Sequence, residues 1–360
     1  GAPDISWVVQ EPQLGTGHAV MAAEAALGDF EGDLVVLVGD AAMIRTETVG
    51  ALLEEHRREG AAVTLVTAIL EDPKWFGRIV RGAAGNLLRI VEAREATPAE
   101  YAIKEVNPSF YAFRWPALRR VLARITNNNN KKEYYLTDAV GLLIEAGEKA
   151  VALPAAQPEE VEAVNGREDL ALVASLMRRR INRALMAAGV TLEDPATTYI
   201  DWDVTIGPDT VVGPCTVIRS GVRIGRGCRV GPMAHLRAGT VLEDGAEAGT
   251  FVETKNARLG ENVLARHLSY LGDVAVGPRT NVGCGTITAN FDGKEKHRTE
   301  VGADAFLGAG TVLVAPTSVG DNARTAAGAV VTRSHPVPPG QTYAGVPARP
   351  LEPKPDGRAE

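Results

Sequence analysis

The feature that most constrains the fold is a six-residue repeat that runs from Ile206 to Val331. Large aliphatic residues recur at every sixth position, usually followed by Gly, and the first of them are Ile206, Val212, Ile218, Ile224, Val230, Leu236 and Leu242. This period fits neither an α-helix nor the alternation of a flat strand. One inward aliphatic residue per hexad is typical of a solenoid in which three hexads make one coil. We therefore predict a left-handed parallel β-helix over residues 196–333.

The repeat is interrupted at three places. One residue is missing before Leu259 and another before Val276, and a longer insertion runs from Thr288 to Glu300. A loop inserted on one side of a solenoid leaves the stacked core intact, so interruptions often carry functional residues. At about 4.8 Å per coil, roughly six to seven coils give a prism on the order of 30 Å long. We attribute the Gly, Asn and Asp residues of the corners to a positive φ.

Length and charge limit the other possibilities. A chain of 360 residues has room for two domains, and its formal charge of -7 argues against a general nucleic-acid binder. No apolar run is long enough to span a bilayer. Three cysteines, Cys215, Cys228 and Cys284, form no CxxC pair, and we interpret them as buried or corner residues of a reducing compartment. We expect a cytoplasmic protein that binds neither nucleic acid nor membrane.

Residues 1–167 alternate apolar runs with amphipathic stretches, which is typical of an α/β domain. We expect a buried parallel strand over 34–38, a helix over 46–59 and a further strand over 62–70. Asp40 follows the first of these strands, at the edge where ligands of α/β sheets bind. Its carboxylate could hold Mg²⁺ or cap the next turn, and spacing alone favours neither.

Residues 168–195 connect the two domains. Their helix, over 168–188, has apolar residues on one side and a basic run at 178–183, and we interpret it as a solvated spacer. Residues 334–360 are rich in Pro, and we expect a flexible tail there.

Several motifs of the first domain occur in the order seen in sugar-1-phosphate nucleotidylyltransferases. They are Gln10-x-x-Gln13-Leu14-Gly15-Thr16-Gly17, Gly39-Asp40, Phe76-Gly77-Arg78-Ile79, Ile90-Val91-Glu92, Glu105-Val106-Asn107, Tyr134-Tyr135-Leu136-Thr137-Asp138 and Val164-Asn165. With the hexapeptide prism after them, the chain resembles the bifunctional family N-acetylglucosamine-1-phosphate uridylyltransferase/glucosamine-1-phosphate N-acetyltransferase, over essentially its whole length to about Arg333.

The resemblance implies a Rossmann-like nucleotidylyltransferase domain and two reactions. Acetyl-CoA acetylates glucosamine 1-phosphate, and the product, N-acetylglucosamine 1-phosphate, is then coupled to UTP to form UDP-N-acetylglucosamine and pyrophosphate. It also implies a homotrimer with acetyl-CoA bound between neighbouring chains.

The resemblance further implies roles for individual residues. In the first domain, the uridine contacts are Gln10, Gly15 and Thr16, the sugar contacts are Gly77, Glu92 and Asn107, and the Mg²⁺ ligands are Asp40 and Asn165. In the prism, the general base is His267, the sugar-phosphate contacts are Arg237, Lys255, Tyr270 and Asn281, and the acetyl-CoA contacts are Asn290, Phe291, Ala309 and Ala327. Imidazole suits a base that works near neutral pH, and Arg and Lys suit a phosphate.

The chain departs from the family pattern at both sites. The family's opening Gly-rich loop, whose Arg and Lys bind the triphosphate, has no counterpart here, so we expect an incomplete first domain and impaired uridylyl transfer. Val38 replaces a common tyrosine. Phe291 and Ala309 replace a tyrosine and a serine, and the tail around Gly345 lacks an arginine expected near CoA.

Three other interpretations stay open. The prism could be only an oligomerising spine of a nucleotidylyltransferase or of an inactive relative, or the whole chain could be a silent structural solenoid. Some hexapeptide prisms bind zinc through three histidines, for which His235, His267 and His297 are the candidates. In a purely structural solenoid, each outward polar residue is an ordinary solvent-exposed residue without a functional role.

Overall fold

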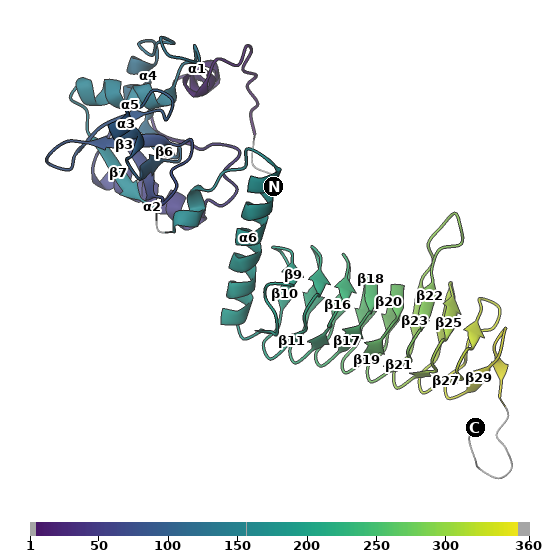
Figure 1. Ribbon diagram of the computed structural model, residues 1–360. Helices are drawn as coiled ribbons and strands as arrows, with labels where there is room; N and C mark the ends of the chain where they lie inside the picture. Colours follow the sequence, from purple (N-terminus) through teal and green to yellow (C-terminus); the bar gives the residue numbers. More distant parts are fainter. Residues whose placement is uncertain (1–4, 156, 352–360) are drawn as a thin grey trace. The chain divides into compact units, whose positions relative to one another are not determined.

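A computed structural model describes residues 5–155 and 157–351. The chain divides into two compact units, Gly1–Ala174 and Ser175–Glu360, and the division falls inside helix α6, Arg167–Ala187. The predicted connector is therefore shared between the units instead of standing between them. Figure 1 shows α/β structure before α6 and a stack of short strands after it.

A seven-stranded sheet forms the centre of the first unit, in the order β1-β6-β2-β5-β3-β4, with β7 beside β2. Among the described strands of this sheet, only β2 and β7 pair in parallel, so the sheet is mixed, unlike the parallel sheet expected from the sequence. The elements are α1 (Thr16–Leu27), β1 (Asp33–Val36), α2 (Thr46–Arg58), β2 (Val63–Ile69), β3 (Gly77–Arg81), β4 (Leu87–Val91), α3 (Pro98–Tyr101), β5 (Glu105–Asn107), β6 (Tyr111–Arg114), α4 (Trp115–Leu122), α5 (Leu136–Glu145), β7 (Ala150–Pro154) and the 3-10 turn η1 (Pro158–Val161).

Helices cover both faces of this sheet, and the side chains of its central strand β2 point alternately to one face and the other. Val63 and Leu65 of β2 belong to a core shared with α1, α4 and α5, whereas Val66 and Ala68 point to the opposite core, which α2 and η1 close. The predicted helix over 46–59 and strand over 62–70 are confirmed as α2 and β2.

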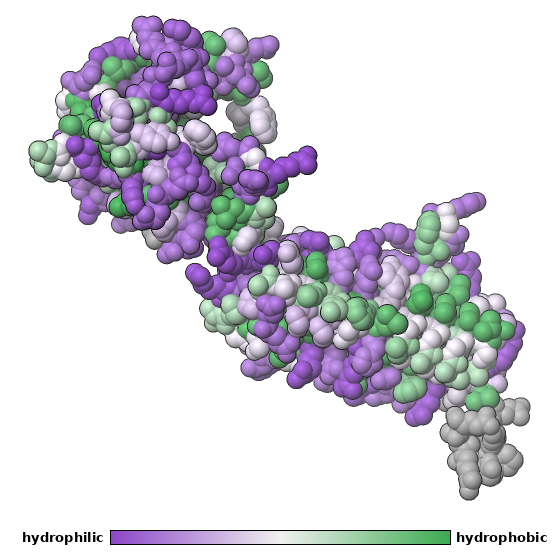
Figure 2. Space-filling model, in the orientation of Figure 1, coloured by the Kyte–Doolittle hydropathy of each residue, from purple (hydrophilic) through white to green (hydrophobic). Residues whose placement is uncertain are grey.

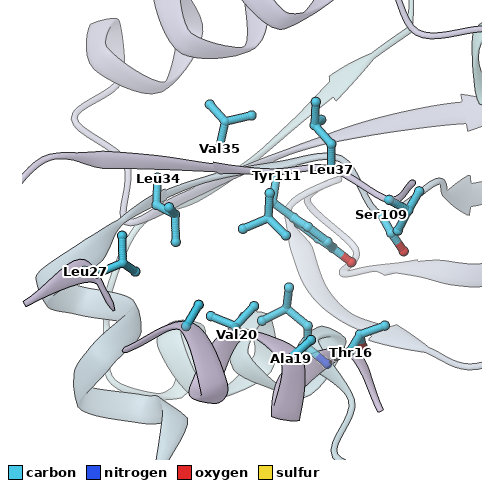
Figure 3. A pocket seen from close by; sticks show the side chains of 13 residues that line it. Thr16, Ala19, Val20, Leu27, Leu34, Val35, Leu37, Ser109 and Tyr111 are labelled. Atoms are coloured by element: carbon cyan, nitrogen blue, oxygen red, sulfur yellow. Dashed lines mark hydrogen bonds between the residues drawn. The ribbon is translucent and has the colours of Figure 1, made fainter. Parts of the chain in front are cut away.

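Strand β1 differs from its prediction. It is a half-buried edge strand that pairs antiparallel with β6, instead of a buried parallel strand. One side of it borders an apolar cavity of about 400 Å³ between β1 and α1, lined by residues such as Val20, Leu27 and Leu34 (Figure 3). The cavity leaves the side chains of β1 less covered than their apolar character predicts.

The second unit confirms the predicted solenoid. Val217 pairs with His235, and Arg223 with Val241, so each coil of the regular part advances by 18 residues, or three hexads. The aliphatic residues of the repeat, from Ile206 to Val331, are buried in one continuous core.

Short strands form the sides of the coils, and all but the last of them pair in parallel. They are β8 (Thr191–Leu192), β9 (Tyr199–Ile200), β10 (Thr205–Ile206), β11 (Val211–Val212), β12 (Val217–Ile218), β13 (Arg223–Ile224), β14 (Arg229–Val230), β15 (His235–Leu236), β16 (Val241–Leu242), β17 (Glu247–Thr250), β18 (Glu253–Leu259), β19 (Leu264–His267), β20 (Tyr270–Val276), β21 (Asn281–Val282), β22 (Ile287–Ala289), β23 (Thr299–Val301), β24 (Phe306–Leu307), β25 (Val312–Val314), β26 (Thr317–Val319), β27 (Arg324–Thr325), β28 (Val330–Val331), β29 (Thr342–Ala344) and β30 (Arg349–Pro350).

The interruptions of the repeat change this geometry. Where one residue is missing, a strand runs without a break around a corner, so β18 and β20 each pair with strands on two sides of the prism. Asn256 and Asp273 take a positive φ at this bend. The insertion after β22 forms a hairpin loop closed by the bridge Phe291↔Lys296, and Figure 1 shows it projecting beyond the coils.

The corner of a coil and the position directly after an inward aliphatic residue favour particular residues for different reasons. The sequence predicted the reason at the corner only. Asp209 and Cys215, three positions after an inward aliphatic residue, take the positive φ expected at corners. The glycine directly after the aliphatic residue is needed for a different reason, since a Cβ on Gly249 would lie 2.2 Å from the carbonyl oxygen of Arg266 in the next coil. Backbones of successive coils approach too closely there for any side chain.

The prism is longer than predicted at both ends. One side of it carries nine parallel strands from β8 to β29, which gives a length of about 40 Å at ~4.8 Å per coil. The expectation of a flexible tail is wrong for 334–351, because β29 continues the stack, β30 pairs with it, and Val337 and Ala348 are buried. The remaining tail residues, 352–360, lie outside the described residues.

The C-terminal half of α6 closes the first coil. Ile181 and Leu185 pack on the prism core, and Asn182 donates hydrogen bonds to the carbonyl oxygens of Pro195 and Thr198 at 2.9 and 3.1 Å. This part of the helix is therefore a cap of the prism and not the solvated spacer predicted.

Candidate functional site

A row of basic residues crosses one side of the prism at the first interruption. The register places Arg237, Lys255 and Gly272 at equivalent positions of three successive coils, following β15 and within β18 and β20. Neighbouring positions in such a row lie about 4.8 Å apart. The Nη1 of Arg237 donates a hydrogen bond to Oε1 of Glu253 at 2.8 Å, which orients the guanidinium.

A third cation reaches this row from the inserted loop. The side chain of Lys296 contacts that of Lys255, and this contact, with the charges of Lys296 and Arg237, lowers the pKa of Lys255. Asp273 opposes the effect. Three cations close together at an exposed surface favour a bound anion, because an anion relieves their mutual repulsion. The sequence assigned no role to Lys296, although the insertion carries a run of basic residues, Lys294, Lys296 and Arg298.

The third position of this row is a glycine for a steric reason. A Cβ on Gly272 would lie 2.5 Å from the Tyr270 hydroxyl and 2.8 Å from the Asn290 side-chain nitrogen. Tyr270 and Asn290 therefore meet above Gly272, and Asn290 also donates a hydrogen bond to Asp273. The structure brings together Arg237, Lys255, Tyr270 and Asn290.

The inserted loop is internally fixed. Asp292 accepts hydrogen bonds from the backbone nitrogens of Glu295 and Lys294 and from His297, and these bonds lower its pKa. Phe291 begins this loop and is mostly exposed. The loop thus holds Lys296 in a defined place beside the prism.

His267 lies at the corner that begins the side on which this row lies. It ends β19, is exposed, and is followed by Leu268 at a positive φ, after which Tyr270 begins the next side. The register from β19 through β21 and β24 to β27 places Ala309 and Ala327 further along the prism, at positions equivalent to His267. The base candidate and two acetyl-CoA candidates thus share one edge, and the backbone nitrogen of Gly328 donates to the oxygen of Ala309 at 2.8 Å.

Asn281 is not part of this cluster within one chain. It begins β21 and pairs with Leu264, at the far end of the side that His267 ends. At ~3.3 Å per residue it lies about 10 Å before the edge that carries His267.

The first unit holds a second group of predicted residues around a cavity of about 260 Å³. Asp40 and Asn165 both line it, together with Asp169 and Lys74. The two segments are joined because the backbone nitrogen of Val164 donates to the oxygen of Asp40 at 3.0 Å. Asp169, which the sequence did not single out, accepts hydrogen bonds from the backbone nitrogens of Asn165 and Gly166.

An adjacent cavity of about 360 Å³ contains Glu92. Burial raises the pKa of this carboxyl group, and a hydrogen bond from Thr137 at 2.9 Å opposes the shift. Gly77 pairs with Asn107 between β3 and β5. The Asn107 side chain is buried and donates to the Tyr111 hydroxyl at 2.6 Å, so its amide nitrogen has a partner inside the protein and the side chain does not line either cavity.

The predicted uridine contacts lie together at the start of α1. Gln10 donates to the carbonyl oxygen of Gly15 at 2.9 Å, and Thr16 accepts a hydrogen bond from the backbone of Leu136. Gly15 has a φ of 107°, and a Cβ there would lie 2.7 Å from the oxygen of Tyr134. Thr16 faces the apolar cavity beside β1 (Figure 3).

Comparison with known proteins assigns both units. Residues 2–158 match the family model for nucleotidyl transferases, residues 203–238 the bacterial transferase hexapeptide (six repeats), and residues 298–333 the hexapeptide repeat of succinyl-transferase. The bifunctional protein GlmU of Pelobacter propionicus is 44% identical, across 93% of this chain and 80% of its own length. The chain belongs to the GlmU family. The GlmU proteins of Geobacter metallireducens and Brevibacillus brevis are 42% and 41% identical, over 82% and 79% of their lengths.

Solved structures resemble the chain more distantly. The acetyltransferase domain of PglB from Neisseria gonorrhoeae, in complex with acetyl coenzyme A, is 23% identical with a TM-score of 0.25, over 49% of this chain and 67% of its own. A UDP-glucose pyrophosphorylase complexed with UDP-glucose is 14% identical with a TM-score of 0.39, over 49% of this chain and 66% of its own. These scores support no functional assignment, which rests on the GlmU relatives.

Two further observations concern metals and membranes. In the described parts of the chain, no three His, Cys, Asp or Glu side chains gather in a way that could hold a metal ion. His235 begins β15, whereas His297 is bonded to Asp292 in the inserted loop. None of the helices within 5–155 and 157–351 combines the length and apolar character needed to cross a bilayer.

Proposed function

We propose that the prism transfers an acetyl group from acetyl-CoA to the amine of glucosamine 1-phosphate. The observation that supports this most is the cation cluster of Arg237, Lys255 and Lys296 on the side of the prism that follows the corner at His267. A sugar phosphate needs cations at one end, and an amine nucleophile needs a base at the other. The cluster and the histidine occupy neighbouring sides of one corner.

In the proposed reaction, the three cations bind the 1-phosphate and Tyr270 and Asn290 orient the sugar ring. The neutral amine attacks the thioester carbonyl, and the C–N bond forms while the C–S bond breaks. His267 accepts the amine proton, which is then available to the departing CoA thiolate. A positioned base of this kind contributes typically about 10²- to 10⁴-fold to the rate.

We propose that the first unit acts on the product of this reaction, because the relatives are named bifunctional and residues 2–158 match the family model for nucleotidyl transferases. Asp40 and Asn165 would hold Mg²⁺ there, because an oxygen donor set with one carboxylate and one amide suits a cation that keeps most of its waters. When bound, the ion would neutralise phosphate charge. Glu92 would accept a hydrogen bond from the sugar.

We further propose that the chain works as a homotrimer. Met233, Phe251 and Leu268 stack along the corner that carries His267, each at a positive φ and each about half exposed, although turn formers fit such positions better. Figure 2 shows apolar residues gathering on the prism surface as well. A neighbouring chain at this corner would cover the apolar residues and could supply Asn281.

The test is release of free thiol from acetyl-CoA with glucosamine 1-phosphate as acceptor. We expect turnover with this acceptor and much less with glucosamine, because the latter lacks the phosphate that the cations bind. No thiol release, or equal release with both acceptors, contradicts the proposal. The first result would favour the interpretation of the prism as an oligomerising spine.

A further inference from the structure

An exposed tryptophan lies between the two polar cavities of the first unit. Trp75 is 74% exposed, and it and Asn165 are the residues that line both cavities. A large indole left open to water has an energetic cost unless a partner covers it. Neither the expected metal ligands nor the expected sugar contacts account for it.

Hydrogen bonds from Arg78 hold the backbone of the loop that carries Trp75. Arg78 is buried to 1% exposure, and its guanidinium donates hydrogen bonds to the carbonyl oxygens of Lys74 at 3.2 Å, Tyr101 at 3.3 Å and Pro73 at 3.4 Å, and also to that of Phe76. Its Cζ also lies 4.7 Å from the centre of the Tyr101 ring. A buried cation satisfied by backbone oxygens fixes the path of the chain around it.

A second contact ties this loop to the opposite wall. Lys74 takes a φ of 45°, and its Nζ lies 3.4 Å from Oε2 of Glu162, in the segment that leads to Asn165. The backbone that carries Trp75 is therefore held in a defined position beside both cavities. A preorganised aromatic surface binds a ligand with little loss of conformational entropy.

We propose that Trp75 is a stacking surface for the pyranose ring of the amino-sugar phosphate bound in the first unit, a proposal that rests on the function proposed above. A pyranose has an apolar C–H face and a rim of hydroxyl groups. The indole face of Trp75 suits the apolar C–H face. The hydroxyl rim suits the polar groups of Glu92, Tyr135 and Asn165, which line the cavity of about 360 Å³ together with Trp75. A uracil ring is the less suitable occupant, because the predicted uridine contacts Gln10, Gly15 and Thr16 line neither of these two cavities.

Fluorescence tests the position of the ligand. The chain has four tryptophans, of which Trp115 is buried at 1% exposure, so in a Trp7→Phe/Trp202→Phe variant Trp75 is the one exposed indole. We expect N-acetylglucosamine 1-phosphate to shift its emission to shorter wavelength and to protect it from acrylamide. If the sugar phosphate at millimolar concentration leaves emission and quenching unchanged, the proposal is wrong.

Calorimetry tests the contribution to affinity. In a Lys255→Met background, which weakens binding at the prism, Trp75→Ala should lower affinity for N-acetylglucosamine 1-phosphate about tenfold, and Trp75→Phe should retain most of it. Affinity for uridine should not change. Unchanged sugar affinity, or an equal loss for uridine, overturns the assignment. Thiol release from acetyl-CoA, measured on Trp75→Ala with Lys255 intact, tests the function of the prism separately and should be unaffected.

Discussion

Lys255 of β18 and Lys296 of the inserted loop touch each other, and their contact lowers the pKa of Lys255. Two ammonium groups stay so close only where the fold holds them there. The loop insertion thus adds a cation to a row that the regular coils already provide.

Substitution of Lys296 should weaken phosphate binding. We expect Lys296→Met to raise KM for glucosamine 1-phosphate roughly tenfold and to change kcat little, because the phosphate is bound equally in ground and transition states. Lys294→Met, in the same loop, is the matched control. Because removal of Lys296 lets the pKa of Lys255 rise toward its ordinary value, the increase of KM with alkaline pH should begin at a higher pH in the variant. Equal effects of both substitutions would contradict this role.

His267 should control the chemical step. We expect His267→Ala to lower kcat for acetyl transfer at least about a hundredfold with sugar affinity largely kept, since the base acts on the proton and not on binding. His297→Ala removes a histidine of the inserted loop and should change kcat little. An unchanged kcat in His267→Ala removes this residue from the mechanism.

Asn281 should act on the site of a neighbouring chain. Lys255→Met and Asn281→Ala should each be impaired, but co-refolded equal mixtures should regain roughly a quarter of wild-type activity, because about one interface in four then carries both native residues. Lys255→Met mixed with Arg237→Ala should regain none, since these two residues share one side of one chain. Absence of recovery in the first mixture would mean that Asn281 serves no shared site.

Glycine substitutions should separate close packing from helix propensity. Gly249→Ala should destabilise the prism by about 1–3 kcal/mol or more, because its Cβ would lie 2.2 Å from the Arg266 oxygen. A Cβ on Gly50, inside α2, would meet open space, with no atom of another element within 4 Å. Gly50→Ala should therefore stabilise the first unit by about 0.5–1 kcal/mol. Thermal unfolding measures both, and a tolerated Gly249→Ala would show that the coils can separate.

His56 should make the first unit less stable in acid. Burial lowers its pKa below 6.5, with Asp33 opposing and Arg114 and Arg57 assisting, and its Nδ1 lies 3.0 Å from the Thr64 hydroxyl. Below about pH 6.5 the unfolded chain therefore binds more protons at this histidine than the folded one, and stability falls as pH falls. Denaturant unfolding between about pH 7.5 and 5 should show this slope. His56→Gln should reduce it, and an identical slope would exclude His56 as the cause.

The sequence predicted the prism well because each coil repeats one local rule. The inward aliphatic residues were visible as a regular period. The missing residues before Leu259 and Val276 and the inserted loop were visible as changes of that period, and the structure confirms all of these features. The ends were harder to predict. Tail residues such as Val337 and Ala348 continue the core after the hexad pattern has faded among prolines, so their burial depends on tertiary packing.

The sequence indicated the positions of some candidate residues better than those of others. Arg237 and Lys255 lie in one row because an 18-residue coil places them there, which the period itself implied. The separation of Asn281 from them depends on which side of the prism each hexad forms. Trp75 and Lys296 could not be assigned from sequence, because a single exposed indole or lysine gains meaning only from its neighbours in space.

The regular coil of 18 residues is the unit by which the prism can lengthen. Because Val312 pairs with Val330 one full coil later, a whole coil could be duplicated after β23 without turning any downstream side chain to a different side. An insertion of a few residues has no such freedom, and must leave the coil as a loop. Growth by 18 residues would therefore extend the edge that carries His267, Ala309 and Ala327, whereas a shorter insertion would create a new loop of the kind that carries Lys296.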